Sequence, residues 1–89
     1  MVYLVSYDLR KKGKDYIGLF EQLKNSPGWC HYLGSTWLIS TNEQPKDLHK
    51  RLSAHLDEND YILITQFSGN YYGTLPEDAW QWIRNQGFY

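Results

Sequence analysis

The residues best suited to chemistry in this chain lie close together near its amino end. Asp8 follows a run of apolar and aromatic residues, and four cations come directly after it, Arg10, Lys11, Lys12 and Lys14. A carboxylate at this position either binds a divalent metal ion or accepts hydrogen bonds from the following turn. Lys and Arg side chains bind phosphate groups unless they simply face solvent in a loop. The pattern therefore suits phosphate recognition, with Mg²⁺ as a possible cofactor.

A second group of residues with binding potential is aromatic. Bases stack on exposed aromatic side chains, and each such contact contributes about 1–3 kcal/mol. Aromatic side chains also pack well between subunits, which is the interpretation that we favour here. The candidates for stacking or for an interface are Tyr7, Trp29, Tyr32 and Trp37.

Charge is distributed unevenly along the sequence. The net charge is −1, but residues 1–51 contain eight Lys and Arg against five acids, and residues 52–89 contain one Arg against five acids. A protein that binds long duplexes needs a broad basic stripe, because the duplex carries a regular array of phosphates. The single basic cluster therefore favours a small anionic ligand or a short contact with nucleic acid.

The chain of 89 residues fits one small domain. Four Trp, eight Tyr and three Phe are more than such a core buries completely, so we expect some of them at a subunit interface or a ligand surface. Cys30 is the single cysteine, which excludes an internal disulfide. A lone thiol and apolar runs no longer than a strand predict a cytoplasmic protein that does not cross a membrane.

The apolar periodicity and the turn residues divide the chain into short elements. In order, they predict a strand at 2–9, a helix at 15–24, strands at 29–33 and 36–41, a helix at 45–56, a strand at 61–67, a short fifth strand at 71–72 and a helix at 76–84. The order βαββαβ over residues 1–67 predicts a ferredoxin-like α+β domain, with a four-stranded antiparallel sheet and two helices on one face. Residues 68–89 form an extension of this single domain. The other face of the sheet stays open, and we therefore expect a homodimer.

These features together resemble a known family. The first strand ends in Tyr7-Asp8, the element order is βαββαβ, and Asp57-Glu58-Asn59-Asp60 leads into the fourth strand. In these respects the chain resembles the small ferredoxin-like CRISPR-associated nuclease family, the dimeric subunit of the spacer-acquisition complex, and its virulence-associated protein D relatives. Residues 4–9 and 29–37 look closest to a bacterial and phage branch that is often labelled SinR-like.

The resemblance covers residues 1–67 and implies a role for one residue in particular. The family's aspartate at the end of the first strand corresponds to Asp8, and in a dimer two such carboxylates would face a Mg²⁺ ion whose bound water can attack a phosphodiester. The sequence departs from the family pattern in its low positive charge and in its Trp-rich last helix.

Three functions remain open at this point. The first is a homodimer that binds nucleic acid or nucleotide phosphates through the loop at 10–14 and an aromatic surface. The second is a Mg²⁺-dependent nuclease that uses paired Asp8. The third is a phage or host protein that sequesters a small nucleotide signal. A plain assembly subunit without a ligand is a further alternative. The sequence does not decide whether the protein is an enzyme.

Overall fold

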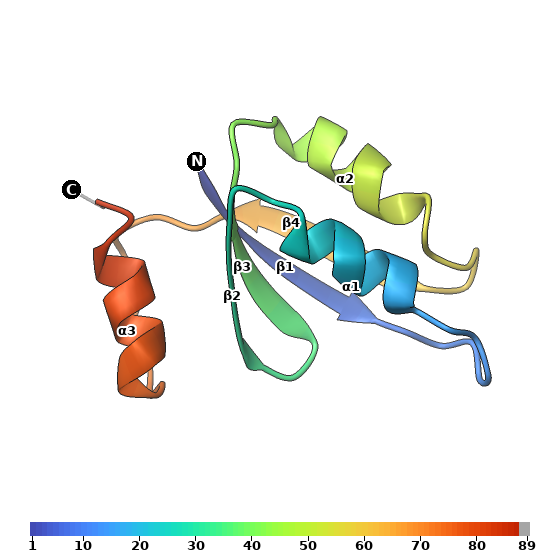
Figure 1. The fold of residues 1–89 in the computed structure, drawn as a ribbon, viewed down its shortest axis with the longest axis horizontal. Coiled ribbons are helices and arrows are strands. Elements are labelled where there is room, and N and C mark those ends of the chain that lie inside the picture. Colours follow the sequence, from blue (N-terminus) through green and yellow to red (C-terminus); the bar gives the residue numbers. More distant parts are fainter. Residues whose placement is uncertain (88–89) are drawn as a thin grey trace.

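The computed structural model describes residues 1–87, which form one antiparallel sheet and three helices (Figure 1). The elements, in chain order, are β1 (Val2–Asp8), α1 (Ile17–Lys24), β2 (Gly28–Leu33), β3 (Thr36–Ser40), α2 (Pro45–Ser53), β4 (Tyr61–Gln66) and α3 (Glu77–Arg84). The strands lie in the order β2-β3-β1-β4, and every neighbouring pair is antiparallel. None of the helices in residues 1–87 is long and apolar enough to span a membrane.

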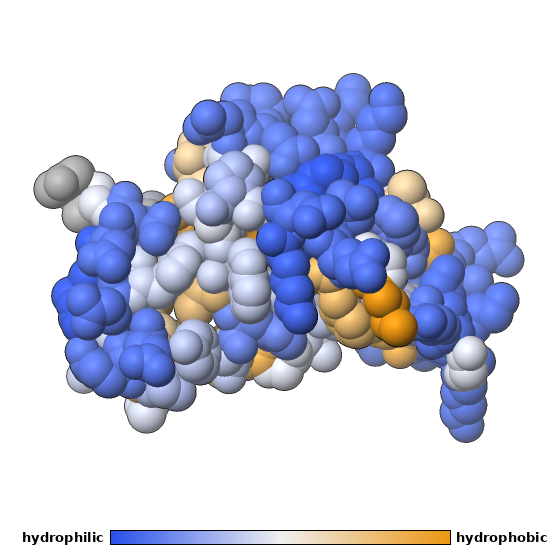
Figure 2. Space-filling model, in the orientation of Figure 1, coloured by the Kyte–Doolittle hydropathy of each residue, from blue (hydrophilic) through white to orange (hydrophobic). Residues whose placement is uncertain are grey.

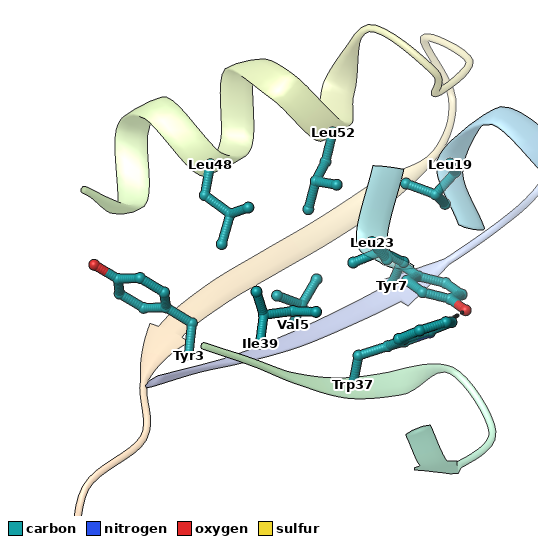
Figure 3. Packing of buried hydrophobic residues seen from close by; sticks show 9 residues of the cluster. All are labelled: Tyr3, Val5, Tyr7, Leu19, Leu23, Trp37, Ile39, Leu48 and Leu52. Atoms are coloured by element: carbon teal, nitrogen blue, oxygen red, sulfur yellow. Dashed lines mark hydrogen bonds between the residues drawn. The ribbon is translucent and has the colours of Figure 1, made fainter. Parts of the chain in front are cut away.

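The main core lies between the sheet and helices α1 and α2, as Figure 3 shows. Each helix contributes two fully buried leucines four residues apart, which places both on one side of the helix. Alternation along the strands directs every second side chain toward these helices. The buried residues of this core are Tyr3, Val5, Tyr7, Leu19, Leu23, Trp37, Ile39, Leu48 and Leu52.

A smaller cluster lies on the opposite face of the sheet, beneath α3. Ala79 and Ile83, one helical turn apart, are buried there against residues from β1, β2 and β3. The sheet residues of this cluster are Val2, Cys30 and Leu38. The cover ends before β4, where the side chain of Leu63 is 66% exposed on the same face.

The structure confirms a mixed α and β domain with a four-stranded antiparallel sheet, and it corrects two expectations. The segment 67–76 contains no strand, so the fifth strand predicted at Tyr71-Tyr72 is wrong. The ring of Tyr71 instead lies near Phe67 and Trp80, with centroids 5.1 and 6.0 Å away. The second face of the sheet, which we expected to be open, is partly covered by α3, and its β4 side remains bare.

Candidate functional site

The pairing of β1 with β4 brings the chemistry-bearing residues to one end of the sheet. Asp8 lies opposite Tyr61, so the loop at 10–14 that follows β1 lies next to the turn that precedes β4. The backbone N–H of Arg10 donates to Asp60 Oδ1 at 2.7 Å. Within the loop, Gly13 has a φ of +76°, a conformation that favours glycine. Figure 1 shows this loop at the end of the molecule away from α3.

Asp60 anchors the loop through several hydrogen bonds. The Tyr16 hydroxyl lies 2.9 and 2.8 Å from its two carboxylate oxygens, and the Asp57 N–H donates to Oδ2 at 2.7 Å. Desolvation alone would raise the pKa of Asp60, but the N–H groups of Arg10 and Asp57 and the Tyr16 hydroxyl outweigh it and lower that pKa. Desolvation and the bond to Asp60 raise the pKa of Tyr16. Asp60 thus holds the loop in place, a structural role that its position in a polar turn of the sequence does not predict.

Two of the four loop cations are paired with carboxylates. Arg10 Nη1 lies 2.9 Å from Asp8 Oδ2, and both side chains are more than half exposed. Lys11 Nζ lies 3.4 Å from Asp57 Oδ1. An exposed ion pair such as Arg10–Asp8 contributes roughly 0–1 kcal/mol, so Arg10 can exchange its carboxylate for a phosphate at little cost. The Asp57 side chain is only 17% exposed, so the pair with Lys11 is the more firmly held of the two.

The other two loop cations are less engaged. Lys14 Nζ lies 5.5 Å from the centre of the Tyr16 ring. Lys12 is exposed and forms no hydrogen bond or ion pair with any residue between 1 and 87. The capacity of the loop for an anionic ligand is therefore greatest at Lys12, with Arg10 and Lys14 on either side of it in the chain.

Tyr61 is a candidate binding residue that sequence reasoning missed. Its side chain is 66% exposed, and the guanidinium carbon of Arg10 lies 5.5 Å from the centre of its ring. An exposed ring next to a guanidinium suits a stacked base. Tyr61 is identified by its position opposite Asp8 in the sheet. The sequence of either strand alone does not reveal this register. We call Arg10, Lys12, Lys14 and Tyr61 the loop-end surface.

The carboxylates of a single chain do not fit a Mg²⁺ site. Asp8 is paired with Arg10, and the oxygens of Asp60 accept the hydrogen bonds that hold the loop. No group of three His, Cys, Asp or Glu side chains within residues 1–87 is placed to hold a metal ion. The paired Asp8 centre thus depends wholly on a second copy, and it stays a prediction.

The four aromatic candidates fall into two classes. Tyr7 and Trp37 are buried in the main core, where Trp37 Nε1 donates to the Tyr7 hydroxyl at 3.0 Å (Figure 3). This corrects the expectation that they line a ligand or subunit surface. Trp29 and Tyr32 on β2 are exposed, and Lys24 Nζ lies 5.6 Å from the centre of the Trp29 ring. Both lie at the far edge of the sheet from the loop-end surface.

A cavity of about 340 Å³ lies between the second face of the sheet, the segment 67–76 and α3. Its walls include Tyr32, Phe67, Tyr71 and Trp80, and no Lys or Arg from residues 1–87 lines it. In the surface view, the outer side of α3 and the region of the loop are both mainly hydrophilic (Figure 2). Aromatic walls and the basic loop therefore do not form one pocket within a single chain.

The comparisons with known proteins leave the site to be interpreted from its own geometry. No protein-family model matches this chain, and no curated protein or solved structure matches it. The contacts and charges of the loop-end surface are therefore the basis for inferring a function.

Proposed function

We propose that this chain is a ferredoxin-like homodimer that binds nucleic acid or nucleotide phosphates at the loop-end surface. The observation that carries the proposal is the position of Tyr61 beside Arg10. The ring offers a base a surface to stack on, and the cations of the adjoining loop offer contacts to phosphate. Lys12, which is free of carboxylate partners within residues 1–87, is the cation best placed to bind the phosphate.

The arrangement of the strands and helices supports the ferredoxin-like part of this proposal. The strand order β2-β3-β1-β4, the antiparallel pairing throughout and the packing of α1 and α2 on one face are what a split βαβ order produces. The α3 helix is an addition that covers the β2 and β3 side of the second face.

The partial neutralisation of the loop sets the class of ligand. Asp8 and Asp57 each balance one of the four cations. A short single strand or a nucleotide needs only a few positive charges, whereas a duplex gains affinity from many phosphate contacts at once. The ligand is therefore a short single-stranded segment or a free nucleotide.

The proposal is tested by fluorescence anisotropy with a labelled single-stranded oligonucleotide and, separately, a labelled nucleotide. We expect Tyr61→Ala to weaken binding about tenfold, because base stacking contributes about 1–3 kcal/mol. Lys12→Ala should weaken binding about two- to fivefold and reduce its dependence on salt. Lys50→Ala, which removes an exposed lysine from α2, is the matched control and should bind as the wild type does. Unchanged affinity in both Tyr61→Ala and Lys12→Ala would contradict the proposed site.

A further inference from the structure

The outer side of β4 carries hydrogen-bonding groups that no strand uses. β4 is an edge of the sheet. Phe67 donates its N–H to the Val2 carbonyl at 2.8 Å, in the register that pairs β4 with β1. Successive residues of a strand direct their backbone groups to opposite sides, so those of Ile62, Ile64 and Gln66 point away from β1. Among residues 1–87 these groups have no hydrogen-bond partner.

The two edges of the sheet differ in how they are protected. β4 has the sequence Tyr-Ile-Leu-Ile-Thr-Gln, without charge or proline, and pairs with β1 in an unbroken register. β2, at the other edge, is irregular between Cys30 and Leu33 and contacts α3. Edge strands of soluble proteins are usually charged, interrupted or covered, because a bare edge pairs with other chains. A regular, uncharged edge of this kind therefore fits a strand-pairing surface.

We propose that β4 pairs antiparallel with β4 of a second copy, about a two-fold axis that is perpendicular to the sheet and passes between the two copies of Leu63. The proposal rests on the homodimer proposed above and names the surface that joins its subunits. The outward backbone N–H and C=O groups of Ile62 form hydrogen bonds with those of Ile64 of the partner subunit. The two-fold symmetry repeats this pair between Ile64 and Ile62 of the partner subunit. Two four-stranded sheets thereby join into one sheet of eight strands.

The register follows from complementarity between the two copies. Outward backbone groups belong to residues 62, 64 and 66, and a two-fold axis at residue 63, 64 or 65 pairs at least two of them from each copy. An axis at Leu63 places this exposed side chain against the partner's Leu63 and each Ile62 against an isoleucine. An axis at Ile64 would place Leu63 opposite threonine and Ile62 opposite glutamine. An axis at Thr65 would place Ile64 opposite glutamine and Thr65 against itself. The axis at Leu63 is therefore the one that sets both Leu63 and Ile62 against apolar residues of the partner.

This pairing also joins the two loop-end surfaces. A perpendicular two-fold axis keeps the second faces of both sheets on the same side, so Tyr61 and its counterpart share one face. Because Tyr61 lies opposite Thr65 of the partner subunit, the two tyrosines are about 13 Å apart along the strand direction. The dimer then presents one surface with an aromatic ring and a cation cluster at each end, and a single strand can contact both.

Light scattering after size-exclusion chromatography tests whether the dimer forms through the β4 edge. The wild type should have the mass of a dimer, and Leu63→Lys should have half that mass, because two lysines would meet at the axis. Ile17→Lys, which places the same charge on an exposed apolar position of α1, should remain dimeric. A dimeric Leu63→Lys would overturn the edge while leaving the homodimer intact, and a monomeric wild type would overturn both.

Oxidative crosslinking tests the register. Residue 63 faces its counterpart in a pair without hydrogen bonds, where Cα atoms lie about 4.5 Å apart, within the range of a disulfide. Leu63→Cys should therefore crosslink into a covalent dimer, and Thr65→Cys, whose counterpart is about 13 Å away along the strand, should not. The buried native Cys30 stays in both variants, and the oxidised wild type is the control. Equal crosslinking of the two variants would overturn the proposed axis.

Crosslinking needs no ligand, and Lys12 lies outside β4. If the Lys12→Ala variant keeps the mass of a dimer but binds the oligonucleotide as tightly as the wild type does, the ligand site is contradicted and the β4 edge is not.

Discussion

The two faces of the sheet are stabilised to different extents. Among residues 1–87, the face beneath α1 and α2 buries a cluster of nine residues, whereas the face beneath α3 buries five, and the cover by α3 ends before β4. Hydrophobic stabilisation grows with the apolar area removed from water, so the first face carries most of the stability of the fold. The second face keeps its exposed residues beside β4, where Tyr61 and Leu63 are each 66% exposed. The exposed surface on β4, which contributes little to the core, is the surface that we assign to binding.

Trp37→Ala gives the largest effect that the comparison predicts. Trp37 is 1% exposed, its ring lies 3.8 Å from that of His31, and its Nε1 donates to Tyr7. The substitution leaves a cavity in the main core, and we expect the free energy of unfolding to fall by about 3–5 kcal/mol. Urea unfolding monitored by circular dichroism measures the loss. A loss below about 1 kcal/mol would show that the first face is not the main core.

Ile83→Ala tests the second face. The side chain is 1% exposed but belongs to the smaller cluster, so we expect a loss of about 2 kcal/mol, at the low end for such substitutions. The loss should be local, with faster hydrogen exchange in α3 and little change in β1. Equal acceleration in β1 and α3 would mean that the two faces unfold as one unit.

The two faces also differ in how far the sequence predicts them. Leu19 with Leu23 and Leu48 with Leu52 show helical spacing within a few residues, and the turns before and after the first of these helices contain Gly or Pro. These signals are local, so the elements of the first face follow from the pattern. The docking of α3 and the irregular path of residues 67–76 depend on contacts between distant segments. The pattern at Tyr71-Tyr72 indicates a strand, but its rings pack toward α3.

The candidate site shows the same limit. The cluster at residues 10–14 is visible in the sequence, and the structure places it next to Asp8 as expected. Its neutralisation by Asp57, and the place of Tyr61 beside Arg10, depend on the pairing of β1 with β4. Register of this kind is set by the whole sheet and is absent from any short window of sequence.

Low pH should reduce the stability of the fold through one partly buried ion pair at the first face. Arg51 donates to both oxygens of Glu43, at 3.1 and 2.9 Å, and to the Ser26 hydroxyl at 2.9 Å. These bonds from Arg51 lower the pKa of Glu43 in the folded state. A lowered pKa adds stability above the unfolded value, near 4.5, and that stability is lost as pH falls through the folded value.

Glu43→Gln isolates this contribution. We expect it to reduce stability by about 1.5 kcal/mol at pH 7, the low end for a hydrogen bond to a charged group, and to flatten the loss of stability below about pH 4.5. Urea unfolding at a series of pH values measures both effects. Glu21→Gln, an exposed change on α1, is the control. A variant with the wild-type slope between pH 3 and 5 would show that Glu43 does not carry the acid sensitivity.

Asp8→Asn gives the smallest effect and separates the two functions that the loop-end surface suggests. The side chain of Asp8 is 62% exposed, so the substitution should change the free energy of unfolding by less than about 0.5 kcal/mol. It removes the carboxylate partner of Arg10 and almost nothing else. For a protein that binds phosphate, a freed Arg10 should strengthen binding about two- to threefold at low salt, and the gain should shrink as salt screens the charges.

The opposite outcome belongs to a nuclease. If two Asp8 carboxylates held Mg²⁺, their neutralisation would abolish metal-dependent cleavage and weaken any binding that requires the metal. Anisotropy with and without Mg²⁺, together with a gel assay on the same labelled strand, measures both quantities for wild type and variant. Asp47→Asn, an exposed change on α2, controls for the loss of one negative charge. We expect tighter binding in Asp8→Asn and no cleavage by either protein, because the only side-chain partner of the Asp8 carboxylate within residues 1–87 is Arg10, a cation that a phosphate can take over.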